Sequence, residues 1–197
     1  MCMTSSQLLR IVILLGTARK GAVSAAVARA LAQAVQDSAG DAKVELVSVA
    51  DHLKASRTIP AWQEDDKEAH PSSWCEVARE ADAFIFVLPE YNHGYPGEWK
   101  LLIDSCGEEY ARKPVTVCGV SAGVFGGRAL ADNVKPVLVE LKMVPTRNNM
   151  YIGKAHEVVS PNGEWNLSPQ EVERLIGLAR DELFELARGL RPLRNVS

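Results

Sequence analysis

The sequence of 197 residues has no excess of positive charge, because 22 lysines and arginines stand against 25 aspartates and glutamates, a net charge of −3. Binding to a phosphate backbone needs a basic surface, so nucleic acid is not an expected partner. Long apolar runs are missing too. The N-terminal run Ile11–Leu15 follows a single basic residue, Arg10. It is too short for a membrane span of about 20 residues and lacks the form of a signal peptide. We therefore expect no membrane association and a cytoplasmic location.

Clustered cysteines are also absent. Cys2, Cys75, Cys106 and Cys118 are scattered, with no CxxC pair and no metal-ligand spacing. In a cytoplasmic protein such cysteines are expected to be reduced thiols. The acidic run at residues 64–68 is expected to be a solvated loop rather than a metal site. The sequence thus predicts no metal centre.

Several phosphate-binding motifs fail at residues 16–24. Gly16 and Gly21 have the spacing of a Walker A loop, but Ala22 stands where its lysine is required. A dinucleotide-binding GxGxxG is excluded because position 18 is alanine. No cysteine is present to serve as the nucleophile of a small phosphatase, and no Ser-His-Asp, Cys-His or metal pattern occurs elsewhere.

Short apolar runs alternate with longer helical patterns along the whole chain. The runs that predict strands are Arg10–Leu15, Lys43–Val49, Ala83–Leu88, Pro114–Val120 and Arg147–Ile152. The segments that predict helices are Ala22–Asp37, Ser72–Ala81, Gly97–Tyr110, Phe125–Lys142 and Ser168–Gly189. Ser168-Pro169-Gln170-Glu171 has the pattern of a capped helix start, and Gly189 is a plausible stop. This alternation predicts one α/β domain over residues 1–197, with a parallel sheet covered by helices on both faces.

Three loops should meet at one edge of this sheet, because ligands bind outside the carboxyl ends of parallel strands. The first loop, residues 16–24, carries Thr17, Arg19 and Ser24 at a helix N-terminus. Free amides, hydroxyls and a guanidinium there suit a phosphate monoester. An ordinary turn with helix-capping hydroxyls is the alternative.

The second loop, residues 89–97, reads PEYNHGYPG and follows a buried strand without a gap. Its rigid backbone, free amides and two tyrosines suit a flat ring system, and a plain turn explains them less well. The third loop, residues 119–128, carries Ser121, Gly123 and Gly126. Small residues there let the backbone approach a ligand closely, although a glycine-rich turn before a helix is again the alternative.

The second loop, with Lys100 and Ile103-Asp104 after it, resembles the flavin-contacting segment of the NADPH-dependent FMN reductase family. That family comprises flavodoxin-like quinone, azo and chromate reductases, and the resemblance covers roughly residues 10–152. It implies a flavodoxin-like three-layer sandwich with a five-stranded sheet of order 2-1-3-4-5. It also implies tightly bound FMN, NADPH or NADH as hydride donor, and a homodimer or homotetramer.

The resemblance also implies roles for individual residues. Thr17, Arg19 and Ser24 would hold the FMN phosphate. The residues expected to contact the isoalloxazine are Pro89, Glu90, Tyr91, Asn92, His93 and Gly94, and those expected on its far side are Ser121, Gly123 and Gly126. One departure is Glu98-Trp99, which replaces the small or aliphatic pair usual after Pro-Gly. Trp99 and Leu102 are expected either at a subunit interface or buried in the monomer.

The expected function is transfer of a hydride from NAD(P)H through bound FMN to a quinone, azo compound, flavin or metal oxyanion. The cofactor carries such chemistry and the protein supplies position and electrostatics, so no catalytic side chain is firmly expected. His93 is a candidate for polarising the acceptor. Two alternatives stay open, a flavodoxin-type electron carrier and a redox-responsive flavin-binding regulatory module. The mild charge of −3 argues against the carrier, which usually docks through a strongly acidic surface.

Overall fold

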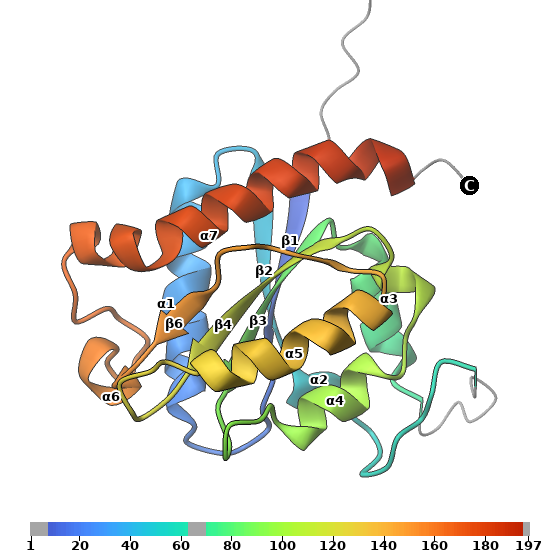
Figure 1. Cartoon of the computed structure of the whole chain (residues 1–197), viewed down its shortest axis with the longest axis horizontal. Helices are drawn as coiled ribbons and strands as arrows, with labels where there is room; N and C mark the ends of the chain where they lie inside the picture. The colour runs from blue at the N-terminus through green and yellow to red at the C-terminus, as the bar shows by residue number, and fades with distance from the viewer. Residues whose placement is uncertain (1–7, 63–69, 195–197) are drawn as a thin grey trace, which may run out of the picture.

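A parallel β-sheet forms the centre of the computed structural model, which describes residues 8–62 and 70–194 (Figure 1). Cys2 and the acidic run at 64–68 lie outside the described residues. The strands are β1 (Leu9–Leu15), β2 (Ala42–Ser48), β3 (Ala83–Pro89), β4 (Pro114–Val120), β5 (Val144–Pro145) and β6 (Met150–Ile152). The order is β2-β1-β3-β4-β5, with β6 also paired to β4 and every pairing parallel. The expected order 2-1-3-4-5 is confirmed.

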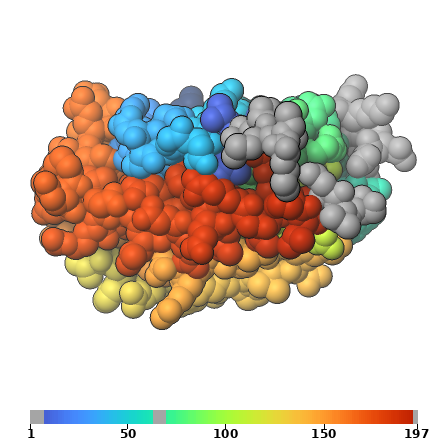
Figure 2. Space-filling view, turned by 90° about the horizontal axis from the view of Figure 1, so that it is seen from above, coloured from blue at the N-terminus to red at the C-terminus, as the bar shows by residue number. Residues whose placement is uncertain are grey.

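Helices cover both faces of the sheet. The longer ones are α1 (Val23–Ser38), α3 (Ser72–Glu80), α4 (Gly97–Ile103), α5 (Arg128–Glu140) and α7 (Pro169–Leu190). The short ones are α2 (Val49–His52), α6 (Ala155–Val158) and two 3₁₀ turns at Glu108–Tyr110 and Arg191–Arg194. Residues of α1 and α7 belong to one buried cluster, and residues of α3, α4 and α5 belong to the other. The result is the expected three-layer sandwich. Figure 2 shows α7 running along the molecule beside α1.

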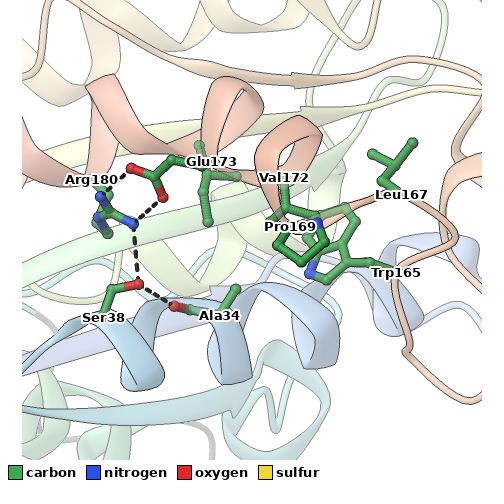
Figure 3. Close-up of a pocket in the computed structure, with 9 residues that line it drawn as sticks. Ala34, Ser38, Trp165, Leu167, Pro169, Val172, Glu173 and Arg180 are labelled. Carbon is green, nitrogen blue, oxygen red and sulfur yellow. Dashed lines mark hydrogen bonds and ion pairs between the residues drawn. The ribbon is translucent and has the colours of Figure 1, made fainter.

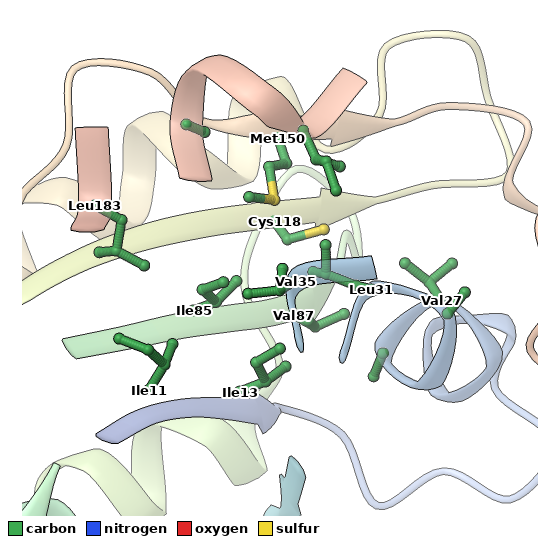
Figure 4. Close-up of a cluster of buried hydrophobic side chains, with 14 of the residues drawn as sticks. Ile11, Ile13, Val27, Leu31, Val35, Ile85, Val87, Cys118, Met150 and Leu183 are labelled. Carbon is green, nitrogen blue, oxygen red and sulfur yellow. The ribbon is translucent and has the colours of Figure 1, made fainter. Parts of the chain in front are cut away.

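Alternation along the strands decides which cluster each side chain joins. In β1, Ile11 and Ile13 face α1 and α7, whereas Val12 and Leu14 face the opposite helices. Figure 4 shows the first of these clusters, in which Leu31 of α1 packs against the sheet. All five side chains are inaccessible to solvent. Because both faces are covered, the strands read as continuous apolar runs in the sequence.

The predicted strand Arg147–Ile152 is wrong in part, because β5 ends at Pro145 and β6 begins at Met150. Side-chain bonds replace the ladder between them. The Glu182 carboxylate of α7 accepts bonds from Arg147 N at 2.7 Å and from Asn148 N at 2.9 Å. These backbone groups are therefore satisfied without strand pairing.

Helix boundaries follow the capping pattern at one end of α7 and depart from it at the other. The Ser168 side chain accepts from Glu171 N, and the Glu171 carboxylate accepts from Ser168 N, so the expected capping box is present. Gly189 does not end the helix, which runs through Leu190 into a 3₁₀ turn. Arg188 then pairs with Asp41 and Arg194 with Asp82, and these ion pairs hold the extended end of α7 against the sheet.

The expectation that the cysteines are reduced thiols is wrong for Cys75 and Cys106. Cys75 of α3 and Cys106, which follows α4, form a disulfide, whereas Cys118 is a buried free thiol. Sequence spacing gave no sign of this pair, because the two residues are 31 apart and meet only when α3 packs against the segment that follows α4. Burial raises the pKa of the Cys118 thiol to about 12, which keeps it protonated.

Over the described residues, no helix is both long and apolar enough to cross a membrane.

Lys113 provides an unexpected buried cation, with 6% of its surface exposed. Its Nζ donates to Ala78 O at 2.5 Å and to Arg79 O at 2.7 Å, at the C-terminal end of α3. Burial, reinforced by the nearby charge of Arg194, lowers the pKa of Lys113 to about 7 from 10.5. Between these two values the unfolded chain binds a proton that the folded chain does not, so folding stability from this group rises with pH.

Lys113→Met should lower the free energy of unfolding by about 1–3 kcal/mol at pH 9, because two buried carbonyls lose their donor. The loss should become smaller as the pH falls from 9 to 7, because over this range the unfolded chain binds a proton at Lys113 that the folded chain does not, which lowers the stability of the native protein alone. Urea unfolding at pH 7 and pH 9 measures both values. The exposed Lys43→Met is the control and should change little at either pH. An equal loss for Lys113→Met at the two pH values would contradict this account.

Candidate functional site

The first and second loops lie side by side at the lower edge of the sheet in Figure 1, where β1 and β3 end. The parallel register aligns the carboxyl ends, since Leu15 lies opposite Val87 and Val87 opposite Cys118. Gly16 N then donates to Val87 O at 2.9 Å, which holds the start of the first loop on β3. A Cβ at Gly16 would lie 2.1 Å from Leu88 Cδ2, so a larger residue there would have to displace the buried Leu88 side chain.

These loops enclose a hollow of about 200 Å³. It is lined by Arg19, Val23, Ser24, Pro89, Glu90, Tyr91, Val120, Ser121, Ala122, Ala155 and His156. The lining therefore comes from all three predicted loops and from α6. The hollow lies at the carboxyl ends of the strands, where ligands bind in open α/β sheets.

The end of the hollow at α1 suits a phosphate. Ser24 is 2% exposed, and its Oγ has no hydrogen-bond partner among the described residues. A buried hydroxyl without a partner is costly and needs an explanation. The first N–H groups of α1 have no partners inside the helix, and they carry a partial positive charge. Within residues 8–62 and 70–194, the Arg19 guanidinium donates through Nε alone, to Tyr91 Oη at 3.1 Å. An anionic phosphate oxygen would satisfy Ser24 and these donors together.

The second loop is held in shape by α5. Glu90 Oε2 accepts from Leu130 N at 3.3 Å, and Asn133 Nδ2 donates to His93 O at 2.9 Å. Asn92 and His93 both adopt positive φ, at 50° and 66°. Such backbone is unfavourable for residues other than glycine and persists where the surroundings fix it. The loop is therefore presented to the hollow in one defined shape.

The third loop closes on itself. Ser121 Oγ donates to Gly123 O at 2.9 Å and accepts from Gly126 N at 3.1 Å. A Cβ at Gly126, where φ is +62°, would lie 2.6 Å from the carbonyl carbon of Tyr151. Gly126 is thus required for packing against β6. A Cβ at Gly123 would meet nothing within 4 Å.

The predicted site residues divide into two groups. Those that line the hollow are Arg19, Ser24, Pro89, Glu90, Tyr91 and Ser121. Those outside its lining are Thr17, Asn92, His93, Gly94, Gly123 and Gly126. Thr17 is buried, with its hydroxyl 2.7 Å from Glu98 Oε1. The His93 side chain is 82% exposed, and its Nδ1 lies 3.5 Å from Glu90 Oε1.

Neighbouring aromatic residues turn inward. Tyr95 packs edge-on against Trp99, with ring centroids 5.0 Å apart, and does not line the hollow. Trp99 and Leu102 are fully buried in the monomer, which is the second of the two alternatives for them.

Sequence reasoning missed Ala155 and His156. Both follow β6 by three or four residues, and the segment after Gly153 reads as an irregular surface loop. A usable signal existed, because β6 is parallel to β4 and its carboxyl end must reach the same edge of the sheet. His156 adds a second basic side chain to the hollow, beside Arg19.

A larger hollow of about 360 Å³ lies between α1 and α7 (Figure 3). Its polar groups are already paired, because Arg180 binds the Glu173 carboxylate twice at 2.7 Å and donates to Ser38 Oγ at 3.1 Å. Trp165 Nε1 donates to Ala30 O. With no unsatisfied group of the kind found at Ser24, this hollow is a weaker candidate despite its size.

Comparison with known proteins identifies the family of the chain. The family model described as NADPH-dependent FMN reductase matches residues 9–157. A quinone reductase of Pseudomonas putida is 31% identical over 171 residues, which is 82% of this chain and 87% of that protein. A quinone reductase of Escherichia coli is 32% identical over 160 residues, 75% of this chain and 79% of that protein. Among solved structures, the flavoenzyme NAD(P)H:(acceptor) oxidoreductase FerB of Paracoccus denitrificans superposes with a TM-score of 0.73. It is 21% identical and is matched over 93% of this chain and 99% of its own, so it supports the fold.

Ser24→Ala should affect ligand binding and folding in opposite directions. FMN affinity should fall by about 1.5–3 kcal/mol, the range for a hydrogen bond to a charged group. The free energy of unfolding without ligand should stay constant or rise, because an unpartnered buried hydroxyl is removed. Flavin fluorescence titration and urea unfolding measure the two quantities.

Riboflavin, which lacks the phosphate, should bind native and variant protein equally. Ser72→Ala in the first turn of α3 makes the same change at an exposed position and should alter neither quantity. If Ser24→Ala leaves FMN affinity unchanged, the phosphate does not lie at the N-terminus of α1.

Proposed function

Because this chain belongs to the NADPH-dependent FMN reductase family, we propose that it is a quinone reductase whose FMN lies in the hollow at the carboxyl ends of β1, β3 and β4. It is an FMN-dependent enzyme that uses NAD(P)H. Two relatives above 30% identity carry the name quinone reductase, which supports this class of acceptor. Azo compounds, free flavins and metal oxyanions are the other acceptor classes to be assayed.

The observation that carries the placement is the buried Ser24 hydroxyl, which has no partner among the described residues and faces a hollow beside Arg19. FMN fits these groups, since its phosphate would take the bonds that Ser24 Oγ and the first turn of α1 leave unused. Bound FMN supplies the ring that accepts and donates hydride. We propose that Thr17 shapes the phosphate loop and that Arg19 and Ser24 contact the phosphate.

The remaining predicted residues receive roles that fit their positions. Pro89, Glu90 and Tyr91 form the wall toward the flavin ring, with Asn92, His93 and Gly94 at the rim. Ser121 belongs to the lining on the side of the third loop, whereas Gly123 and Gly126 lie behind it in that loop, where Gly126 maintains packing against β6. The exposed His93 imidazole is our candidate for polarising an acceptor that approaches the rim.

The assembly and location remain proposals as well. Val124 and Phe125 beside the hollow are 65% and 76% exposed, and exposed apolar side chains of this kind support the expected homodimer or homotetramer. We propose a cytoplasmic location, as for other enzymes that draw on NAD(P)H. A flavodoxin-type carrier is less well supported, because the net charge of −3 gives little basis for electrostatic docking.

The first test is the absorbance spectrum of the purified protein, followed by release and identification of the flavin. A flavin spectrum with rapid oxidation of NADPH in the presence of a quinone would support the proposal. A bound flavin with negligible turnover would instead favour the carrier. A complex with another protein that forms only in one flavin redox state would favour the regulatory module.

Initial rates with NADPH at several fixed quinone concentrations should give parallel lines in a double-reciprocal plot. We expect donor and acceptor to occupy the same place in turn, so that each product leaves before the next substrate enters. Excess quinone should inhibit competitively against NADPH for the same reason. Intersecting lines would mean that both substrates bind together in two places, which a hollow of about 200 Å³ does not favour.

A further inference from the structure

The Glu98 side chain extends from α4 to the first loop and accepts hydrogen bonds there. Its Oε1 accepts from Thr17 Oγ1 at 2.7 Å and from Ala18 N at 3.1 Å. Burial opposes ionisation of this carboxyl, but the hydrogen bonds from Thr17, from its own backbone N–H and from Ala18 N together outweigh it, and the pKa of Glu98 lies below its usual value. A carboxylate therefore stands in the loop beside the hollow at neutral pH.

The direction of the bonds around Thr17 can be worked out. An ionised carboxylate only accepts, so the single hydroxyl proton of Thr17 goes to Glu98. Thr17 Oγ1 lies 3.2 Å from Tyr91 Oη, and Tyr91 must then donate that bond. Arg19 Nε in turn donates to Tyr91 Oη at 3.1 Å. A chain of donors thus runs from the Arg19 guanidinium through Tyr91 and Thr17 to the Glu98 carboxylate.

This chain has two consequences for an anion in the first loop. Thr17 O–H and Ala18 N–H are already used, so an incoming phosphate finds them occupied. One unit of negative charge also lies within the loop that carries Arg19, and it both offsets the guanidinium and repels a second anion. Ser24 takes no part in this chain of bonds, and its hydroxyl has no partner among the described residues.

We propose that Glu98 is a specificity-determining residue of the cofactor site: by taking the Thr17 and Ala18 donors and placing a negative charge in the first loop, it reduces the preference of the site for FMN over riboflavin. The inference rests on the proposed function, because it requires the flavin phosphate to lie in the first loop. A neutral side chain at position 98 makes the same loop select the phosphate more strongly.

The test compares native protein with Glu98→Gln and Glu98→Ala. Dissociation constants for FMN and for riboflavin come from quenching of flavin fluorescence at low salt and again at about 0.5 M NaCl, where exposed charges are screened. Gln keeps an oxygen that accepts from Thr17 and Ala18, so Glu98→Gln removes the charge alone. Glu98→Ala removes the charge and also frees both donors.

In Glu98→Gln the ratio of riboflavin to FMN dissociation constants should rise about three- to tenfold at low salt, the scale of one charge pair at a partly exposed site. In Glu98→Ala it should rise at least as much, and the rise in Glu98→Gln should shrink at high salt. The control Glu140→Gln removes one charge from an exposed position at the end of α5 and should leave the ratio unchanged. Far-ultraviolet dichroism confirms that each variant is folded.

A lower ratio in Glu98→Gln would overturn the inference, since it would mean that the carboxylate helps to bind the phosphate. An unchanged ratio in a folded Glu98→Gln overturns it as well. Both results leave the proposed function intact, because native protein still binds FMN. Failure of native protein to bind either flavin would contradict the proposed function itself.

Discussion

The parallel pairing of β1 with β3 and of β3 with β4 is the constraint on which the site depends. It places Leu15, Val87 and Cys118 in one row across the sheet, so the segments that follow these strands leave it at the same edge. Helices buried against both faces fix the strands and leave the edge as the place for irregular backbone. The first turn of α1 is thereby brought to the same hollow as the loops after β3 and β4.

Loop shape depends on bonds from side chains to backbone rather than on the strand ladder. Glu90 and Asn133 tie the second loop to α5, and Ser121 folds the third loop on itself. Strain at Asn92 and His93 is maintained by these anchors. A flat ligand would then meet a wall already in shape, which reduces the entropy lost when it binds.

Basic and acidic side chains both lie at the edge of the sheet that holds the hollow. Arg19 and His156 supply basic groups, whereas Glu90 and Glu98 bring carboxylates to the same edge. The Glu90 carboxylate accepts a hydrogen bond from the backbone of α5, and the Glu98 carboxylate accepts from a backbone N–H and a hydroxyl of the first loop. These carboxylates therefore shape the loops while they limit the positive potential available to a phosphate.

Much of the site could be predicted from residue types that follow apolar runs. Arg19, Ser24 and the PEY segment at 89–91 line the hollow, and the sequence predicts a ligand edge there because donors and rigid backbone come directly after strands. Glu98 and His156 could not be found in this way. Glu98 belongs to a helix, where a glutamate is ordinary, and His156 lies in a segment that reads as an irregular surface loop rather than directly after the strand. The Cys75–Cys106 pair also lies beyond such reasoning, because α3 must pack against the segment after α4 before the residues meet.

The sequence by itself determined the alternation of elements, the two-sided burial of the sheet and the positions of the three loops, since hydrophobic periodicity and turn residues are local properties. The capping box at Ser168 belongs to the same class. Only the tertiary structure decided three other features. Bonds to Glu182 replace strand pairing between β5 and β6, Thr17 donates to Glu98, and the Ser24 hydroxyl has no partner among the described residues. These outcomes join residues 34 to 81 positions apart or leave an atom without a partner, and both depend on which side chains packing brings within hydrogen-bond distance.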